Sequence, residues 1–376
     1  MGIPDIIPPG SPATAEWWEK TRRPELLRLF SENVYGVTPA ELPKASYSLV
    51  DKPCGYPGVN ASVLTITMER NGRACSFCCD IYCPAEAADP MPAKTAAPMP
   101  VSAAAPMPAE AAATMPAVIM IDPFSRRGWD AEQIYSHCPP DIITRAGFMA
   151  VHAHVDQACA DDAREYGRGL MELYPPEGAA GWGAVGGWAF CASRVVDYLL
   201  ARGDVKTDGI AVCGCSRAGK TALWCGAQDT RVAVTISNVS GCTGAAITRD
   251  KKGERVADIT SVFPHWFCAN YAAYSGREVD LPVDQHMLLA LCAPRPVYVS
   301  SASEDEWADP QMEFAAALLC GDAYEIFGKS GLPDEYMPPV NTPLLSGDVG
   351  YHNRQGEHGC ETYDWEIFLK FMKKYV

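Results

Sequence analysis

The sequence predicts an α/β fold in which a mostly parallel sheet is covered by helices on both faces. After residue 117, strand-like and helix-like segments alternate along the chain. The strand-like segments are short, continuous apolar runs, which is typical of strands buried on both faces. Hydrophobic residues make up 48% of the 376 residues, enough for a large core. We therefore expect a single domain over residues 1–376, arranged as three layers of helix, sheet and helix.

The elements follow in order from these patterns. Residues 15–37 are expected to form a helix that leads into a loop, because their apolar residues recur near helical spacing. The expected strands are 46–50, 61–68, 74–82, 117–121, 147–152, 209–213, 232–237 and 296–301. The expected helices after the N-terminal one are 183–200, 219–226, 309–319 and 363–375.

The segment 84–116 has a different composition. It consists almost entirely of Ala, Pro, Met, Glu and Ser, and the sequence Ala-Pro-Met-Pro occurs at 97–100 and again at 105–108. Such a segment cannot bury enough apolar surface to fold alone. We interpret it as a low-complexity insertion between two strands, with a binding tract as the alternative.

Charge and hydropathy exclude several classes of partner. The formal net charge of −15 leaves no basic surface for nucleic-acid phosphates. No apolar run reaches the length needed to span a bilayer. The first residues lack the basic and apolar regions of a signal peptide, so we expect an intracellular protein, or a secreted or periplasmic one whose signal has been removed.

The 16 cysteines are scattered, and many lie within apolar runs. This pattern is typical of buried thiols in a reducing compartment. Cys75 and Cys78 have the spacing of zinc ligands, but no second pair follows at a matching distance. A β-hairpin with buried thiols is the preferred interpretation of Cys75, Cys78, Cys79 and Cys83, and we expect no metal.

A serine lies in a sharp turn between a predicted strand and a predicted helix. The sequence 210–222 runs from a buried strand through Gly214, Cys215 and Ser216 into a helix. This is the context of a nucleophile elbow, in which the hydroxyl projects above the end of the sheet. The N–H group of Arg217 would lie at a helix N-terminus and could stabilise an oxyanion. Ala218 replaces the second glycine of the usual Gly-x-Ser-x-Gly motif.

The same residues also match a phosphate-binding loop. Gly214 is followed after four residues by Gly219, Lys220 and Thr221. A P-loop nucleotide-binding protein that uses Gly214–Thr221 is therefore an alternative from another functional class. A histidine and acids downstream, in the order nucleophile, acid, base, favour a hydrolase.

Several motifs together resemble one family. Residues 214–220 (Gly-Cys-Ser-Arg-Ala-Gly-Lys) look like the serine motif of the glucuronoyl esterases, family 15 of the carbohydrate esterases, in their bacterial form. The resemblance continues through residues 236–242, 263–267, 281–286, 293–296, 304–310 and 356–358. It implies an α/β-hydrolase fold. It also implies hydrolysis of 4-O-methyl-glucuronoyl esters that link glucuronoxylan to lignin alcohols, through an acyl-enzyme and without a cofactor.

The candidate base is His358, in a Gly-rich turn before the last helix; His352 is the competing histidine. Some family members carry the triad acid after the strand that follows the nucleophile helix, but Val239 stands at that position here. The acid is therefore expected in the later loop, where Asp305 best matches the family and Glu304 is the alternative. A solvated charge run is the alternative for all three carboxylates of that loop, Glu304, Asp305 and Glu306.

By the same resemblance, Arg217 would stabilise the oxyanion through its side chain as well. Lys220, Trp307 and Glu254 would bind the sugar, although Trp307 could be a core residue and Glu254 a solvated one. The expected partner is glucuronoxylan or a glucuronic-acid ester oligosaccharide, and we expect a monomer. A carbohydrate acetyl or acyl esterase is a second candidate. Cys215 and Cys360 could form a disulfide or remain thiols.

Overall fold

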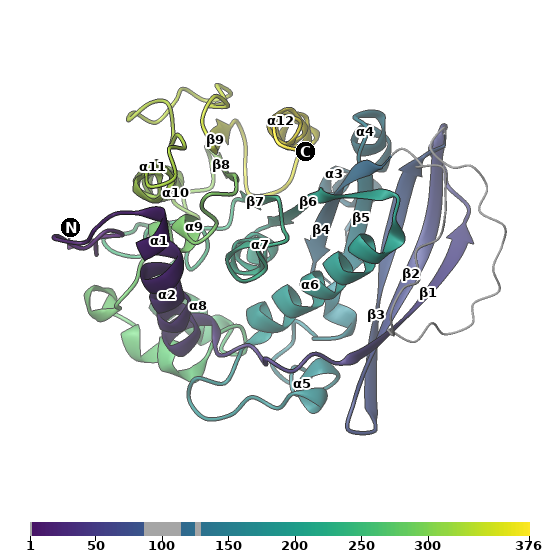
Figure 1. Cartoon of the computed structure of the whole chain (residues 1–376), viewed down its shortest axis with the longest axis horizontal. Helices are drawn as coiled ribbons and strands as arrows, with labels where there is room; N and C mark the ends of the chain where they lie inside the picture. The colour runs from purple at the N-terminus through teal and green to yellow at the C-terminus, as the bar shows by residue number, and fades with distance from the viewer. Residues whose placement is uncertain (1, 86–113, 125–128) are drawn as a thin grey trace.

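A computed structural model describes residues 2–85, 114–124 and 129–376 (Figure 1). The described strands form one nine-stranded sheet with the order β1-β2-β3-β5-β4-β6-β7-β8-β9. The strands are β1 (Lys44–Lys52), β2 (Val59–Arg70), β3 (Arg73–Pro84), β4 (Met115–Asp122), β5 (Met149–His154), β6 (Val205–Cys215), β7 (Val234–Asn238), β8 (Val297–Ala302) and β9 (Val349–Arg354). The segment expected as an insertion, 84–116, lies mostly outside the described residues.

The sheet has an antiparallel part and a parallel part. Strands β1, β2 and β3 form an antiparallel meander, and β3 also pairs antiparallel with β5. From β5 to β9 every neighbouring pair is parallel. The carboxyl ends of six strands therefore meet at one edge, which is where ligands bind in sheets of this kind.

Helices cover both faces of the sheet, as Figure 1 shows. The α-helices are α1 (Ala15–Trp17), α2 (Arg23–Phe30), α3 (Ala131–His137), α4 (Pro140–Arg145), α5 (Leu170–Leu173), α6 (Ala184–Arg202), α7 (Arg217–Gln228), α8 (Val256–Val262), α9 (Gln285–Ala290), α10 (Pro310–Leu319), α11 (Gly321–Glu325) and α12 (Thr362–Met372). Short π-helices, η1 (Trp18–Arg22) and η2 (Ser31–Tyr35), join α1 and α2 to the following chain, and 3₁₀ turns form η4 (Val155–Gln157), η5 (Ala269–Tyr274) and η6 (Glu278–Asp280).

Two hydrophobic cores lie on opposite faces of the sheet. In β4, Ile119 packs into the larger core with α6 and α7, whereas its neighbours Val118 and Met120 pack into the smaller core with α4 and α12. Successive side chains of a strand point to opposite faces, so one continuous apolar run supplies both cores. The expected three-layer α/β-hydrolase fold is confirmed.

The expected strands and long helices are present with small shifts of their ends. The N-terminal helix ends at Tyr35, before Gly36, whose φ of +88° no helix continues through. Cys75, Cys78, Cys79 and Cys83 lie in the β2–β3 hairpin, as expected, but only Cys79 is buried and the other three are partly exposed; all 16 cysteines are free thiols.

Strand β9 was not expected from the sequence. Its six residues are all buried, but they include His352, Asn353 and Arg354. Two of these polar side chains, His352 and Arg354, hydrogen-bond to the buried carboxylate of Asp364. Because this carboxylate comes from α12 and compensates the buried polar groups, β9 lacks the apolar pattern of a strand that is buried on both faces.

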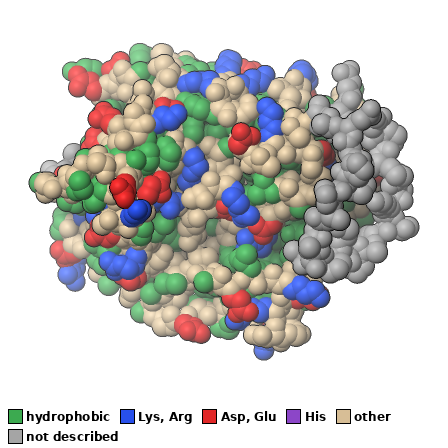
Figure 2. Space-filling view, viewed as in Figure 1, with side chains coloured by type: hydrophobic (Ala, Val, Ile, Leu, Met, Phe, Trp, Pro, Cys, Tyr) green, Lys and Arg blue, Asp and Glu red, His purple; other side chains and the backbone are tan. Residues whose placement is uncertain are grey.

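Figure 2 shows the molecular surface in the orientation of Figure 1. On this face, charged side chains of both signs are scattered among hydrophobic ones, and the described residues form no continuous basic stripe. Within the described part of the chain, no helix combines the length and hydropathy needed to cross a bilayer.

Candidate active site

Ser216 lies in a strained turn at the carboxyl end of β6. Its φ of +59° and ψ of −124° are rare for a residue with a Cβ, and strain of this kind is typical of functional positions. A Cβ at Gly214 would lie 2.0 Å from the carbonyl oxygen of Ala218, so only glycine permits this close approach of strand and helix. The turn places Ser216 directly before α7, with the first N–H groups of the helix beside it.

The P-loop alternative does not fit this geometry. Helix α7 begins at Arg217, inside the matching segment, so no long loop remains to surround a phosphate. The Nζ atom of Lys220 donates to the carbonyl oxygen of Ser240, and the Thr221 hydroxyl donates to that of Arg217. Both side chains that would bind a nucleotide are buried and bonded within the protein.

Asp305 and His358 are brought together from segments 53 residues apart. The Nδ1 atom of His358 lies 2.6 Å from Oδ2 of Asp305. Burial opposes ionisation of Asp305, but the hydrogen bond and charge of His358 outweigh it and hold the pKa of Asp305 below its usual range. The Oδ1 atom of Asp305 accepts from the N–H of Ala308, which fixes the carboxylate.

Glu304 points elsewhere. It is exposed, and its Oε1 accepts a hydrogen bond from the side chain of Gln355. Of the two carboxylates that the sequence left open, the structure brings Asp305 to His358.

The competing histidine, His352, is fully buried in β9. Its Nε2 lies 2.9 Å from Asp364, and its Nδ1 lies 3.0 Å from the hydroxyl of Tyr298. Both ring nitrogens therefore have partners inside the protein, and His352 does not line the cavity beside Ser216.

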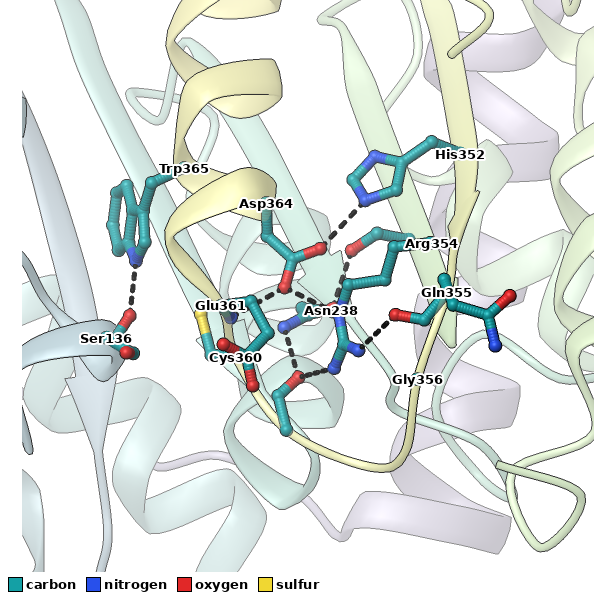
Figure 3. A network of polar contacts seen from close by, with 12 residues as sticks. Ser136, Asn238, His352, Arg354, Gln355, Gly356, Cys360, Glu361, Asp364 and Trp365 are labelled. Carbon is teal, nitrogen blue, oxygen red and sulfur yellow. Dashed lines mark hydrogen bonds and ion pairs between the residues drawn. The ribbon is translucent and has the colours of Figure 1, made fainter. Parts of the chain in front are cut away.

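A polar network fixes the loop that carries His358 (Figure 3). The guanidinium of Arg354 binds Asp364 and donates to the carbonyl oxygens of Glu357 and Gly359. The side chain of Asn238, from the end of β7, donates to the same Gly359 oxygen. The base loop is therefore tied to both β7 and α12.

Ser216, Arg217 and His358 line one cavity of about 470 Å³. The cavity is also lined by Phe124, Trp129, Asp130 and residues of α3. The lining combines two aromatic side chains with acidic, amide, hydroxyl and imidazole groups, and a concave site that combines apolar surface with polar groups is typical of a small-molecule site.

Lys220, Glu254 and Trp307 do not line that cavity. They lie near one another: the N–H of Glu254 donates to the carbonyl oxygen of Trp307, and Glu254 acts electrostatically on Lys220. Lys220 is buried, and burial lowers its pKa. Trp307 is 57% exposed, so it is not a core residue.

Val239 stands at the position where some members of the family are expected to carry the triad acid. It is buried and has a φ of +41°, which is rare for a β-branched residue. The structure therefore keeps the tight turn after β7 without a carboxylate in it.

Cys215 and Cys360 are both buried free thiols, so the structure contains no disulfide between them. Burial raises the pKa of each thiol well above its usual value. The two thiols are therefore neutral and pack as apolar groups at the edge of the cavity.

One group of described residues could offer three ligands to a metal ion: Asp122, His152 and His154, whose ligand atoms lie within 4.8 Å of one another. Burial opposes protonation of His154, but Asp122 and Asp80 outweigh it and raise the pKa of His154 to about 9. Nε2 of His152 lies 2.8 Å from Oδ2 of Asp122, and Nε2 of His154 lies 3.3 Å from Oδ2 of Asp80, so both histidines contact carboxylates in this structure.

Sequence reasoning missed the partners of the expected residues. Asp161 accepts from Arg217, His265 and Trp266, and Arg354 and Asp364 hold the base loop. A signal existed for Asp161, because it follows a predicted buried strand whose carboxyl end belongs to the ligand-binding edge.

The sheet order, with a sharp serine turn after a central parallel strand, defines the class as an α/β-hydrolase. A family model described as "Glucuronyl esterase, fungi" matches residues 98–328, and the chain belongs to this glucuronyl esterase family.

Individual relatives agree. The glucuronoyl esterase from Solibacter usitatus has a TM-score of 0.83 and 33% identity, over 99% of this chain and 97% of that one. Carbohydrate esterase MZ0003, from an unknown prokaryotic organism, is 48% identical over 50% of this chain and 44% of its own length. The 4-O-methyl-glucuronoyl methylesterase 1 of Wolfiporia cocos is 34% identical over 55% of this chain and 52% of its own. The matched region thus spans about half the length of these two curated relatives.

Proposed function

We propose that this chain is a serine esterase that hydrolyses 4-O-methyl-glucuronoyl esters, such as those that link glucuronoxylan to lignin alcohols. The observation that carries the proposal is the Asp305–His358 pair on a cavity that also contains Ser216. Membership of the glucuronyl esterase family supports the substrate class.

In the proposed reaction, the Ser216 hydroxyl attacks the ester carbonyl and its proton passes to His358. Because Nδ1 of His358 is occupied by Asp305, Nε2 is the nitrogen that takes this proton. The N–H and guanidinium of Arg217 stabilise the tetrahedral oxyanion. His358 then returns the proton to the leaving alcohol, and a glucuronoyl ester of Ser216 remains.

Deacylation repeats these steps with water. His358 takes a proton from the water as its oxygen attacks the acyl carbon, and Ser216 leaves with that proton. The products are the uronic acid and the regenerated enzyme. No step in this reaction requires a cofactor.

The sugar is proposed to bind at Lys220, Glu254 and Trp307. Trp307 supports this assignment because it exposes an aromatic face on which a pyranose ring can pack, with an N–H as a polar handle. Lys220 already donates to Ser240, so it would contact a sugar hydroxyl only with its remaining donors.

The experiment compares kcat/KM for benzyl glucuronate, a methyl-esterified glucuronoxylan fragment and 4-nitrophenyl acetate. We expect the two glucuronate esters to be hydrolysed much faster than the acetate. Turnover of the acetate alone would contradict the substrate class and support the acyl esterase alternative.

A further inference from the structure

The guanidinium of Arg217 is held in place on the wall of the cavity. Its Nη1 donates to Oδ2 of Asp161. Three aromatic rings surround it, with the guanidinium carbon 4.7 Å from the ring centre of Trp266, 5.0 Å from Phe124 and 5.3 Å from Phe263. The residue next to Ser216 is therefore confined between a carboxylate and aromatic faces.

Asp161 is itself fixed by neighbours on other elements. Its Oδ1 accepts a hydrogen bond of 2.6 Å from the indole N–H of Trp266 and lies 3.1 Å from Nε2 of His265. Burial opposes ionisation, but the hydrogen bond from His265 and the charge of Arg217 outweigh it and lower the pKa of Asp161. Asp161 is thus a charged group that accepts from three side chains.

The Arg217 side chain has no second hydrogen-bonded anchor in the described part of the chain. Its Nε atom is buried without a hydrogen-bond partner, and its one hydrogen bond goes to Asp161. The aromatic faces restrict the plane of the guanidinium but provide no directional bond. The position of this cation along the cavity wall therefore depends on the Asp161 carboxylate.

We propose that Asp161 is a positioning residue that holds the Arg217 guanidinium where negative charge develops during ester cleavage at Ser216. This inference rests on the proposed function. A donor that is fixed before the reaction stabilises an oxyanion without reorganising during it, so loosening the donor raises the barrier to the chemical step. Ground-state binding of the ester does not depend on that charge, so KM should change little.

The test is a double-mutant cycle with benzyl glucuronate, in which kcat and KM are measured separately. Asp161→Asn keeps the size of the side chain and removes its charge, and we expect it to lower kcat about 10- to 100-fold with KM changed less than about threefold. Asp162→Asn is the matched control, because Asp162 is the exposed neighbouring carboxylate in the same loop, and we expect it to keep wild-type kcat.

Arg217→Ala should lower kcat at least as much as Asp161→Asn. The double variant should then match Arg217→Ala within about threefold, because Asp161 acts only through Arg217. A kcat for Asp161→Asn equal to wild type, or effects that multiply in the double variant, would overturn the proposal. A merely structural role predicts such multiplication.

Folding is followed by circular dichroism and thermal unfolding. If Asp161→Asn does not fold, Asp161→Glu tests the positioning role instead, because it keeps the negative charge but displaces the Arg217 guanidinium. It should lower kcat without raising KM, and wild-type kcat would overturn the proposal.

The activity of wild type distinguishes a failure of the proposed function from a failure of the role proposed for Asp161. If wild type hydrolyses only other esters at Ser216, the substrate class is wrong and the same cycle is measured on the ester that is cleaved. If wild type hydrolyses no ester, both the proposed function and the role of Asp161 are refuted.

Discussion

Asp305 and Glu304 are neighbours in the sequence, but only Asp305 contacts the imidazole of His358. We expect Asp305→Asn to lower kcat for glucuronate esters by about 10³-fold or more, because the amide neither fixes the correct tautomer nor stabilises the imidazolium. Glu304→Gln removes the same charge one residue away and should keep kcat within about threefold. Steady-state kinetics of both variants provides the measurement, and a larger loss in Glu304→Gln would contradict the assignment.

The candidate catalytic residues could be predicted from the sequence, but the side chains that hold them in place could not. Ser216 and His358 stand in short motifs with their own chemistry, and the family resemblance favoured Asp305 over Glu304. Asp161 lies 56 residues from Arg217 in the sequence, so no local pattern connects them. Only the fold brings the loop after β5 to the start of α7.

At the scale of elements, the turn between β6 and α7 depends on Gly214. Gly214→Ala forces a Cβ against the carbonyl oxygen of Ala218, so we expect a loss of about 1–3 kcal/mol in the free energy of unfolding and a loss of activity. Gly167→Ala is the control, because a Cβ there has no neighbour within 4 Å. Urea unfolding measures both variants, and equal stability of Gly214→Ala and wild type would contradict the account of the turn.

Helix α10 contains a buried carboxyl group, Glu313, which should make the stability of the protein depend on pH. Its carboxylate oxygens accept from the N–H of Gly241 and the hydroxyl of Ser301. Burial nevertheless raises the pKa of Glu313 to about 7, from an ordinary value of 4.5. In the unfolded chain Glu313 has its ordinary pKa of 4.5, so the folded protein binds the Glu313 proton more tightly than the unfolded chain does. This difference stabilises the fold fully below about pH 4.5, and the stabilisation is lost as the pH rises through about 7.

The free energy of unfolding should therefore fall between about pH 5 and about pH 8 by more in wild type than in Glu313→Gln. Urea unfolding at a series of pH values measures the difference. Parallel pH dependences of the two proteins would show that Glu313 does not titrate in this range.

Some helices and strands could be predicted from the sequence, and others could not. The strands β4 to β8 were predictable because each contains a short run of buried apolar residues, and α6, α7, α10 and α12 because of their long patterns. Strand β9 was missed because its buried polar side chains bond to α12. Short helices such as α3 and α9 are too brief for a periodic pattern to stand out.

At the scale of the whole molecule, all 16 cysteines are free thiols. Thiol titration under denaturing conditions without reductant should therefore give 16 reactive groups. The same result predicts that a reductant leaves the thermal unfolding midpoint unchanged. A count two lower, restored by reductant, would indicate the Cys215–Cys360 disulfide instead.

Ser216 is proposed to be the nucleophile of a glucuronate esterase. The direct measurement is the hydrolysis of benzyl glucuronate by wild type and Ser216→Ala in parallel, with circular dichroism to verify that both are folded. Wild type should turn the ester over readily, and the variant should lose at least about 10³-fold in kcat. Turnover by folded Ser216→Ala at the wild-type rate would contradict it.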